Sequence, residues 1–313
     1  MIKKVLCFLT VLSLGTVLMS ACGNTAEESA ITDSSCTESI VSEESTEMPE
    51  YIEKYDSLTF TNKGKMGDCD GPSFCVYSKT GYNGASMTVD LGNVDVSLRR
   101  NDDRRYVNAY IFLGSDIHND TGHWINCYDA GFCLSGGGGG WHLFYNIYDC
   151  PDGVNSWYES RVTIKPGVYT LMLDSGKQDG QAELSVIDEG GNVLDSVTIY
   201  AKGIKCDGSN TSFLTDFALD FPENLIYAPG DYVTSDFWKV ILYSTDCGIK
   251  MKNISVSDAS LYIDGEKIKW TEEVTSSVGI WPDKAIKPDY SPVSVEVYSK
   301  YGDYIIHLDM NRE

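Results

Sequence analysis

Apolar and polar residues alternate with a period of two through most of the chain from Ser57 onward. Ala182, Leu184 and Val186 alternate with polar residues, and segments 293–297 and 304–310 repeat the pattern. A period of two places one side of a strand on a core and the other toward water. No long segment has the 3.6-residue period of an amphipathic helix. The pattern therefore predicts an all-β protein.

Turn sequences separate the predicted strands. Chain reversals are expected at Pro166-Gly167, Glu189-Gly190-Gly191-Asn192 and Asp264-Gly265. The apolar parity changes between Met251 and Ile254, which predicts a bulge or bend near Asn253. No repeat of propeller or solenoid length is visible. Many short strands with regular turns favour a two-sheet antiparallel jelly-roll sandwich.

The N-terminus has the composition of an export signal. Lys3 and Lys4 precede a mostly apolar run, 5–21, that ends in Met19-Ser20-Ala21-Cys22. A positive start, a short apolar stretch and small residues before a cut are typical of a secretory signal. The run is a little shorter than the about 20 apolar residues of a spanning helix. An uncleaved N-terminal anchor is the alternative.

The small residues before Cys22 resemble the lipobox of bacterial lipoproteins, with Met19 where leucine is usual. The resemblance implies that residues 1–21 are a lipoprotein signal peptide, cleaved before Cys22, and that Cys22 carries a diacylglyceryl group. Two acyl chains anchor stably, whereas one chain binds a membrane only marginally. The implied location is extracytoplasmic, with the protein lipid-anchored to the cell membrane.

Residues 22–55 are predicted to be the lipidated cysteine and an acidic, disordered tether. Segment 23–50 has eight carboxylates and no Lys or Arg, so it is too polar and too like-charged to form a core. Residues 56–313 then form one β-sandwich domain. The net charge of the chain is −22. The signal contributes +2 through its two lysines and segment 23–50 contributes −8, which leaves −16 on residues 51–313. This excess of acidic residues argues against nucleic acid and anionic lipid headgroups as partners.

Seven of the ten cysteines lie in the predicted domain. Export permits disulfides, but an odd number leaves at least one thiol over. Cys69 with Cys75, and Cys127 or Cys133 with Cys150, are near enough in sequence to form bridges. Free buried thiols are the alternative. No Cys-x-x-Cys pair indicates a zinc ribbon.

The aromatic segment 106–174 predicts successive antiparallel strands, three of which have a face that mixes rings with hydrogen-bonding groups. Sugars are bound by such mixtures, since rings pack on their apolar faces and polar groups bond their hydroxyls. The alternative is that the rings pack the core. The predicted ligand-binding residues are Trp124, Asn126, Tyr128, His142, Asn146, Tyr148, Trp157, Glu159 and Arg161.

Part of this segment resembles the concanavalin A-like sandwiches, and among them the glutamic peptidases. The resemblance covers about a quarter of the chain and lies in four short motifs: Tyr110 to Gly114, Asp129-Ala130-Gly131, Trp157-Tyr158-Glu159 and Pro166-Gly167. Those peptidases use a Gln and a Glu, and Asp129 stands where their Gln lies. No match for their Glu is found. The resemblance therefore implies a sheet geometry more than peptide cleavage.

Other side chains carry alternative chemistry. Asp129 and Glu159 are the candidate catalytic pair if the chain is a hydrolase. A loop with Asp116, His118, Asp120 and His123 has the donors of a metal site, with a solvated polar loop as the alternative. Asp68-Cys69-Asp70-Gly71 resembles the opening of a calcium loop, so a structural Ca²⁺ is the one cofactor the sequence suggests. The glycines at 136–140 predict a hairpin loop.

Together these features predict a cell-surface lipoprotein that binds extracellular carbohydrate or another extracellular polymer through an aromatic and polar sheet face. The sequence leans away from an enzyme. Two alternatives stay open: a glycan or peptide hydrolase on the same fold, and a structural or protein-interaction lipoprotein.

Overall fold

The chain is an all-β sandwich of two antiparallel sheets. A computed structural model describes residues 50–51, 70–99, 101, 106–220, 232–234, 239–241, 248–281, 293–299 and 302–310. The predicted signal peptide, Cys22, most of the tether, Cys69 and Cys247 lie outside the described residues. Two tether residues form a short strand, β1 (Glu50–Tyr51). Within the described residues, no helix is long and apolar enough to span a membrane.

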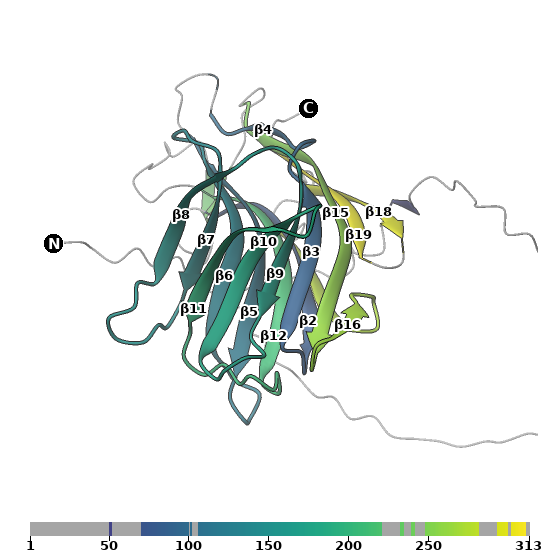
Figure 1. The fold of residues 1–313 in the computed structure, drawn as a ribbon. Helices are drawn as coiled ribbons and strands as arrows, with labels where there is room; N and C mark the ends of the chain where they lie inside the picture. The colour runs from purple at the N-terminus through teal and green to yellow at the C-terminus, as the bar shows by residue number, and fades with distance from the viewer. Residues whose placement is uncertain are drawn as a thin grey trace, which may run out of the picture.

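One sheet has ten strands and the other has seven. The ten-stranded sheet follows the order β1, β18 (Val293–Ser299), β19 (Asp303–Asp309), β15 (Lys250–Ile263), β3 (Gly84–Asp90), β9 (Val168–Asp174), β10 (Gln181–Asp188), β11 (Val193–Tyr200). Two short strands lie off this path and pair with β15: β16 (Glu266–Lys269) and β4 (Asp95–Ser97). The seven-stranded sheet follows the order β17 (Thr275–Trp281), β2 (Asp70–Thr80), β12 (Thr211–Asp220), β5 (Asn108–His118), β6 (Trp124–Ser135), β7 (Trp141–Ile147), β8 (Trp157–Ile164). A separate hairpin joins β13 (Tyr232–Thr234) to β14 (Lys239–Ile241). Figure 1 shows the two larger sheets facing each other.

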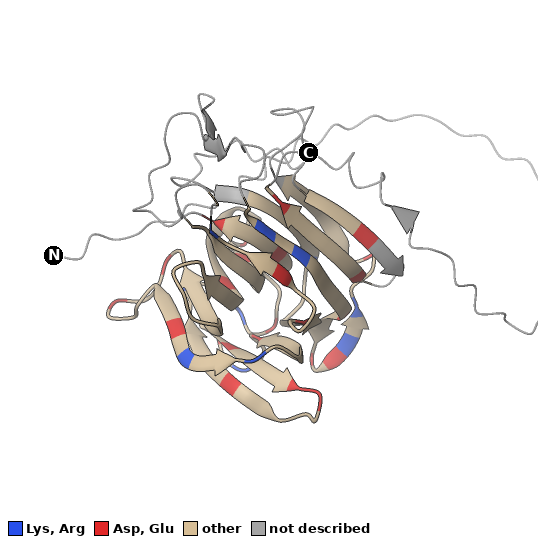
Figure 2. Cartoon of the chain, turned by 90° about the horizontal axis from the view of Figure 1, so that it is seen from above, with Lys and Arg blue, Asp and Glu red and all other residues tan. Residues whose placement is uncertain are grey.

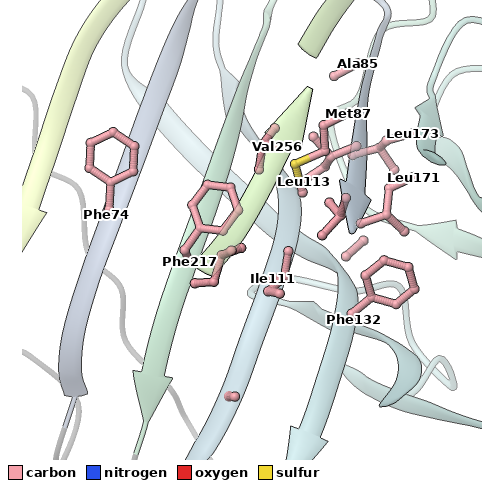
Figure 3. Close-up of a cluster of buried hydrophobic side chains, with 14 of the residues drawn as sticks. Phe74, Ala85, Met87, Ile111, Leu113, Phe132, Leu171, Leu173, Phe217 and Val256 are labelled. Carbon is pink, nitrogen blue, oxygen red and sulfur yellow. The ribbon is translucent and has the colours of Figure 1, made fainter. Parts of the chain in front are cut away.

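The core lies between these two sheets. Strands of both sheets contribute side chains to a single buried apolar cluster. In Figure 3, Met87, Leu171 and Val256 of the ten-stranded sheet meet Ile111 and Phe132 of the seven-stranded sheet. All of these side chains are almost completely buried, which is the main apolar stabilisation of the fold.

Several features predicted from the sequence are confirmed. β10 buries Ala182, Leu184 and Val186, so its alternation has the expected inner face. The turns at 189–192 and 264–265 connect β10 to β11 and β15 to β16 as hairpins. A register shift between Met251 and Ile254 marks the predicted bulge, where Asn253 has a φ of 58°.

The turn at Pro166-Gly167 was predicted to reverse a hairpin, and that prediction is wrong. It follows β8 of the seven-stranded sheet and precedes β9 of the ten-stranded sheet, so it carries the chain from one layer to the other. A turn sequence indicates that the chain bends but does not indicate which strands it joins.

The thiols in the described residues are free: Cys75, Cys127, Cys133, Cys150 and Cys206. The expected bridges of Cys75 with Cys69, and of Cys127 or Cys133 with Cys150, are therefore wrong. Cys75 and Cys133 are buried within the sheet, in keeping with the alternative that these thiols behave as small apolar side chains.

Candidate functional site

The seven-stranded sheet has a second, smaller apolar cluster on the face turned away from the core. We call this face the outer face. Because Phe74, Ile111 and Phe132 point to the core, the neighbouring side chains on their strands point the other way. The buried side chains of this outer cluster are Cys75, Tyr77, Phe112, Cys133, Phe144 and Leu214, with Tyr110 packed against them.

Cross-strand register aligns the outer-face residues in rows. One row runs across six strands: Tyr77, Leu214, Gly114, Asp129, Asn146 and Trp157. Gly114 leaves room for its neighbours in this row, because a Cβ there would lie 3.0 Å from Asp129 Oδ1 and 3.0 Å from Leu214 Cγ. The absence of a side chain at Gly114 therefore lets the Asp129 carboxyl lie over the middle of the sheet.

Asp116 and Asp129 are the central carboxyls of the outer face. Asp129 on β6 lies opposite Gly114 on β5, and Asp116 follows Gly114 by two residues on β5. Diagonal neighbours of this kind have Cα atoms about 7–8 Å apart. Burial raises the pKa of Asp116 to about 7 and that of Asp129 to about 7, and the negative charge of Asp116 adds to the shift at Asp129. Both carboxyls thus hold a proton at mildly acidic pH.

Tyr77 and Asp216 complete this polar centre. Asp216 is buried on β12, and in register it lies between Cys75 and Phe112. Burial is the main cause of the raised pKa of the Tyr77 phenol, and the charges of Asp116, Asp216 and Asp129 also contribute. The Tyr77 hydroxyl therefore remains protonated.

Aromatic rings flank the carboxyls on two sides. The Trp124 indole N–H donates a hydrogen bond to Asp116 Oδ1 at 3.1 Å, and its ring meets that of Tyr148 edge to face at 4.8 Å between centroids. On the other side, the Trp157 ring lies 5.4 Å from that of Phe144 and 6.5 Å from that of Tyr110. Trp157 is 44% exposed and Tyr148 42%, so both present ring surface to solvent.

Most of the predicted ligand-binding residues lie on the outer face, but two do not. The inner side chains of β7 are in the core, so His142 and Asn146 on that strand face outward. Asn126 and Tyr128 are almost completely buried, and Tyr128 belongs to the core cluster. The prediction that these two side chains face solvent beside Trp124 is wrong.

A register shift explains why Trp124 separates from Asn126. The shift between Ile117 and His118 pairs His118 with Trp124 while Ile117 pairs with Asn126. Such a bulge turns side chains on either side of it to different faces. Simple alternation along β6 therefore places Trp124 incorrectly.

Asn126 has a structural role instead. Its amide nitrogen donates to the carbonyls of Asp149 and Lys202 at 2.8 and 2.9 Å. Its amide oxygen accepts from the backbone N–H groups of Asp149 and Cys127 at 2.8 and 2.9 Å. The side chain thus ties β6 to two loops.

Asp129 and Glu159, the predicted catalytic pair, lie farther apart than Asp129 and Asp116 do. Glu159 is exposed on the edge strand β8, two strands away from Asp129 and one row further along. Strand spacing then gives a Cα separation of about 12 Å. Arg161 is also exposed, beyond an irregular register between β7 and β8.

The candidate metal ligands do not converge. Asp116 points to the outer face and bonds Trp124, whereas Asp120 forms an ion pair with Lys205 at 2.7 Å. His123 is exposed, and burial lowers the pKa of His118. Nowhere in the described part of the chain do three or more His, Cys, Asp or Glu side chains form a group that could hold a metal ion. Asp68 of the calcium-loop sequence lies outside the described residues.

Sequence reasoning missed Tyr77 and Asp216 altogether and read Asp116 only as a metal ligand. A signal was present on β12, because Asp216 interrupts the apolar run Phe213 to Leu219. An acid within a strand that is buried on both faces needs a reason, since an unpaired buried charge is costly.

Comparisons with known proteins give structural neighbours only. No protein-family model and no curated protein matches the chain. A Scytalido-glutamic peptidase bound to a peptide-based transition state analog is 12% identical, covering 76% of this chain and 98% of that one with a TM-score of 0.42. SCP-B, an Eqolisin-family peptidase in complex with the tripeptide Ala-Ile-His, is 12% identical over 77% and 98% of the two chains with a TM-score of 0.39. These values show a faint structural similarity and are too low to bear on activity.

The raised carboxyl pKa values predict that Asp116 destabilises the fold as pH rises. The folded chain keeps a proton on Asp116 up to about pH 7, whereas the unfolded chain loses it near pH 4, so stability is lost between those values. The gain of Asp116→Asn relative to wild type should therefore grow from about 1.5 kcal/mol at pH 5 to about 4 kcal/mol at pH 8. Urea unfolding at several pH values measures this. Exposed Asp152→Asn is the control and should show no such gain; a difference for Asp116→Asn that stays constant with pH would contradict the prediction.

Proposed function

We propose that the outer face of the seven-stranded sheet is the active site of a hydrolase, in which Asp116 and Asp129 act as a coupled acid–base pair. The observation that carries the proposal is their position as diagonal neighbours on β5 and β6, both with a pKa of about 7. Titratable groups so strongly shifted are frequent at catalytic sites.

The proposed chemistry follows from the electrostatic coupling of the two carboxyls. Two close carboxyls do not both ionise readily, so near pH 7 one holds a proton and the other is ionised. The ionised carboxyl takes a proton from a water molecule, which attacks the scissile carbonyl. The protonated carboxyl then gives its proton to the leaving amine as the carbon–nitrogen bond breaks. Water is added across the bond, and the pair regains its single proton.

Two neighbours support these steps. The Trp124 N–H bond to Asp116 fixes the orientation of that carboxyl and favours its ionised form. The Tyr77 hydroxyl keeps its proton and belongs to the same outer-face row as Asp129, so we assign it as a hydrogen-bond donor to an oxyanion. We assign the base to Asp116 and the acid to Asp129.

Peptides are the substrate class we favour for this site. Two carboxyls that share one proton are the arrangement that aspartic proteases use to activate water. The aromatic rings on both sides of the pair would hold apolar side chains of an extended peptide.

Asp116→Asn and Asp129→Asn should each lower the rate of peptide hydrolysis at pH 7 by about 100-fold or more, because each removes one member of the acid–base pair. Mass spectrometry of a mixed peptide library incubated with the full chain measures this. Asp152→Asn is the control and should retain the wild-type rate. Wild-type rates in both site variants, or cleavage of glycans and not peptides, would refute the proposal.

A second candidate is binding of extracellular carbohydrate without catalysis. It is favoured by the exposed rings of Trp157 and Tyr148, together with Asn146 and Glu159 on the same face. Here the polymer would lie across the rings at the β7–β8 side of the sheet.

Trp157→Ala should weaken retention on immobilised glycans about tenfold, because it removes an indole that is 44% exposed on the outer face. Affinity electrophoresis in polysaccharide gels measures retention. Tyr200→Ala removes a similarly exposed ring on the other sheet and serves as the control. Equal retention of the two variants would argue against this function.

We further propose that the domain works outside the cell, anchored through lipid on Cys22. The export sequence and the acidic segment that follows support this location. Cys22→Ser should release the protein from the membrane fraction into the medium or periplasm, as judged by immunoblotting of fractionated cells. Cys36→Ser, in the tether, should remain membrane-bound; membrane retention of Cys22→Ser would contradict the lipid anchor.

A further inference from the structure

Trp157 and Glu159 lie side by side on the outer face, on the strand β8 that ends the seven-stranded sheet (Figure 1). In register Trp157 lies opposite Asn146 and Glu159 lies opposite Phe144, so both side chains point to the outer face. Two positions on one face of a strand are about 7 Å apart. A single extended side chain of a bound ligand can therefore contact both residues.

The Trp157 ring offers an apolar surface to such a ligand. Its centroid lies 5.4 Å from that of the buried Phe144 ring, with 31° between the ring planes, so the indole packs against Phe144. The ring also meets Tyr110 edge to face. These contacts hold the indole over the sheet, while 44% of Trp157 stays exposed. A tryptophan ring attracts cations within about 6 Å of its centroid more strongly than other aromatic rings do.

Glu159 offers a carboxylate that has no ion-pair partner in the described part of the chain. Neither Arg161, two residues further along β8, nor any other described cation pairs with it. Burial raises the pKa of the Cys133 thiol on β6, and the charge of Glu159 adds to that shift. The carboxylate therefore acts across the outer face and is free to receive a cation from a ligand.

The charge of the whole protein also favours a cation at this position. Residues 51–313 have a net charge of −16, and acidic positions occur on strands of both sheets (Figure 2). Such a field attracts cationic ligands and raises their rate of association. A neutral sugar would gain nothing from this field.

We propose that Trp157 and Glu159 form a specificity subsite for a lysine or arginine side chain, so that the preferred substrates are cationic peptides. This inference rests on the peptide hydrolysis proposed for Asp116 and Asp129. The aliphatic part of the substrate side chain lies on the indole, and its charged end reaches the carboxylate. Lysine and arginine side chains cover apolar surface in this way while keeping the charged group in water.

The subsite lies a few residues away from the bond that is cleaved. Glu159 is two strands from Asp129, which gives a Cα separation of about 12 Å. An extended peptide advances about 3.3 Å per residue. The basic residue of the substrate therefore stands about three to four positions from the scissile bond, on the side of β8.

Peptide cleavage by the full chain at pH 7 tests the subsite. Cleavage sites in a mixed peptide library should be enriched in Lys and Arg at one position about three to four residues from the scissile bond. For two synthetic peptides with lysine or norleucine at that position, wild type should have a kcat/KM about tenfold higher on the lysine peptide. Glu159→Gln should lower this ratio by about fivefold, and Glu159→Lys should instead favour a peptide with glutamate there.

Glu189→Gln is the matched control, because Glu189 is exposed in the turn between β10 and β11 of the other sheet, and this variant should keep the wild-type ratio. Circular dichroism checks that every variant is folded. A library without enrichment of basic residues, or a ratio that Glu159→Gln leaves unchanged, would overturn the subsite and leave the acid–base pair standing. A wild-type chain that cleaves no peptide would overturn both proposals.

Discussion

The packing of the ten-stranded sheet on the seven-stranded sheet determines the rest of this molecule. Side chains alternate strictly along a strand, so burying Ile111 and Leu113 between the sheets forces Phe112 and Gly114 to the outer face. The same rule applied to β6 sends Ala130 inward and Asp129 outward. The site is thus a consequence of core packing combined with register, and it needs no loop to assemble it.

The outer face combines two properties that oppose each other energetically. Its apolar cluster excludes water from the middle of the sheet, and within that dry region lie several carboxyls. Burying a carboxylate costs free energy, and a carboxyl responds by keeping its proton. A fold selected for stability alone would place apolar side chains at these positions. Acids retained in such surroundings favour a chemical use over a structural one.

The sequence was sufficient for the fold class because alternation and turn composition are local properties. β10, β19, the turn at 189–192 and the bulge at Asn253 were all predicted from neighbours in the chain. The candidate site was predicted only in part. Trp157 and Asn146 lie on the expected face, but the bulge at 117–118 separates Trp124 from Asn126. That bulge depends on how β5 pairs with β6, which no local pattern records.

Asp116 and Asp216 could not be assigned to the site from the sequence, again because strand pairing is not a local property. Asp116 belongs to a loop-like polar sequence and Asp216 to an apolar strand far along the chain, so nothing local relates them to Asp129. Only the pairing of β12 with β5 and of β5 with β6 places all three on one face. The turn at 166–167 likewise bends where expected, and it changes layer because β9 finds its partners in the opposite sheet.

The buried amide of Asn126 has a consequence for the internal motions of the domain. Three of its four hydrogen bonds join the strand to the backbone at 149 and at 202, two stretches more than 50 residues apart in sequence. Neither stretch can move away from β6 without breaking hydrogen bonds to the Asn126 amide, which also binds the other stretch. The two loops should therefore open together as one cooperative unit, with amide protons at 149 and 202 exchanging with solvent at a common rate.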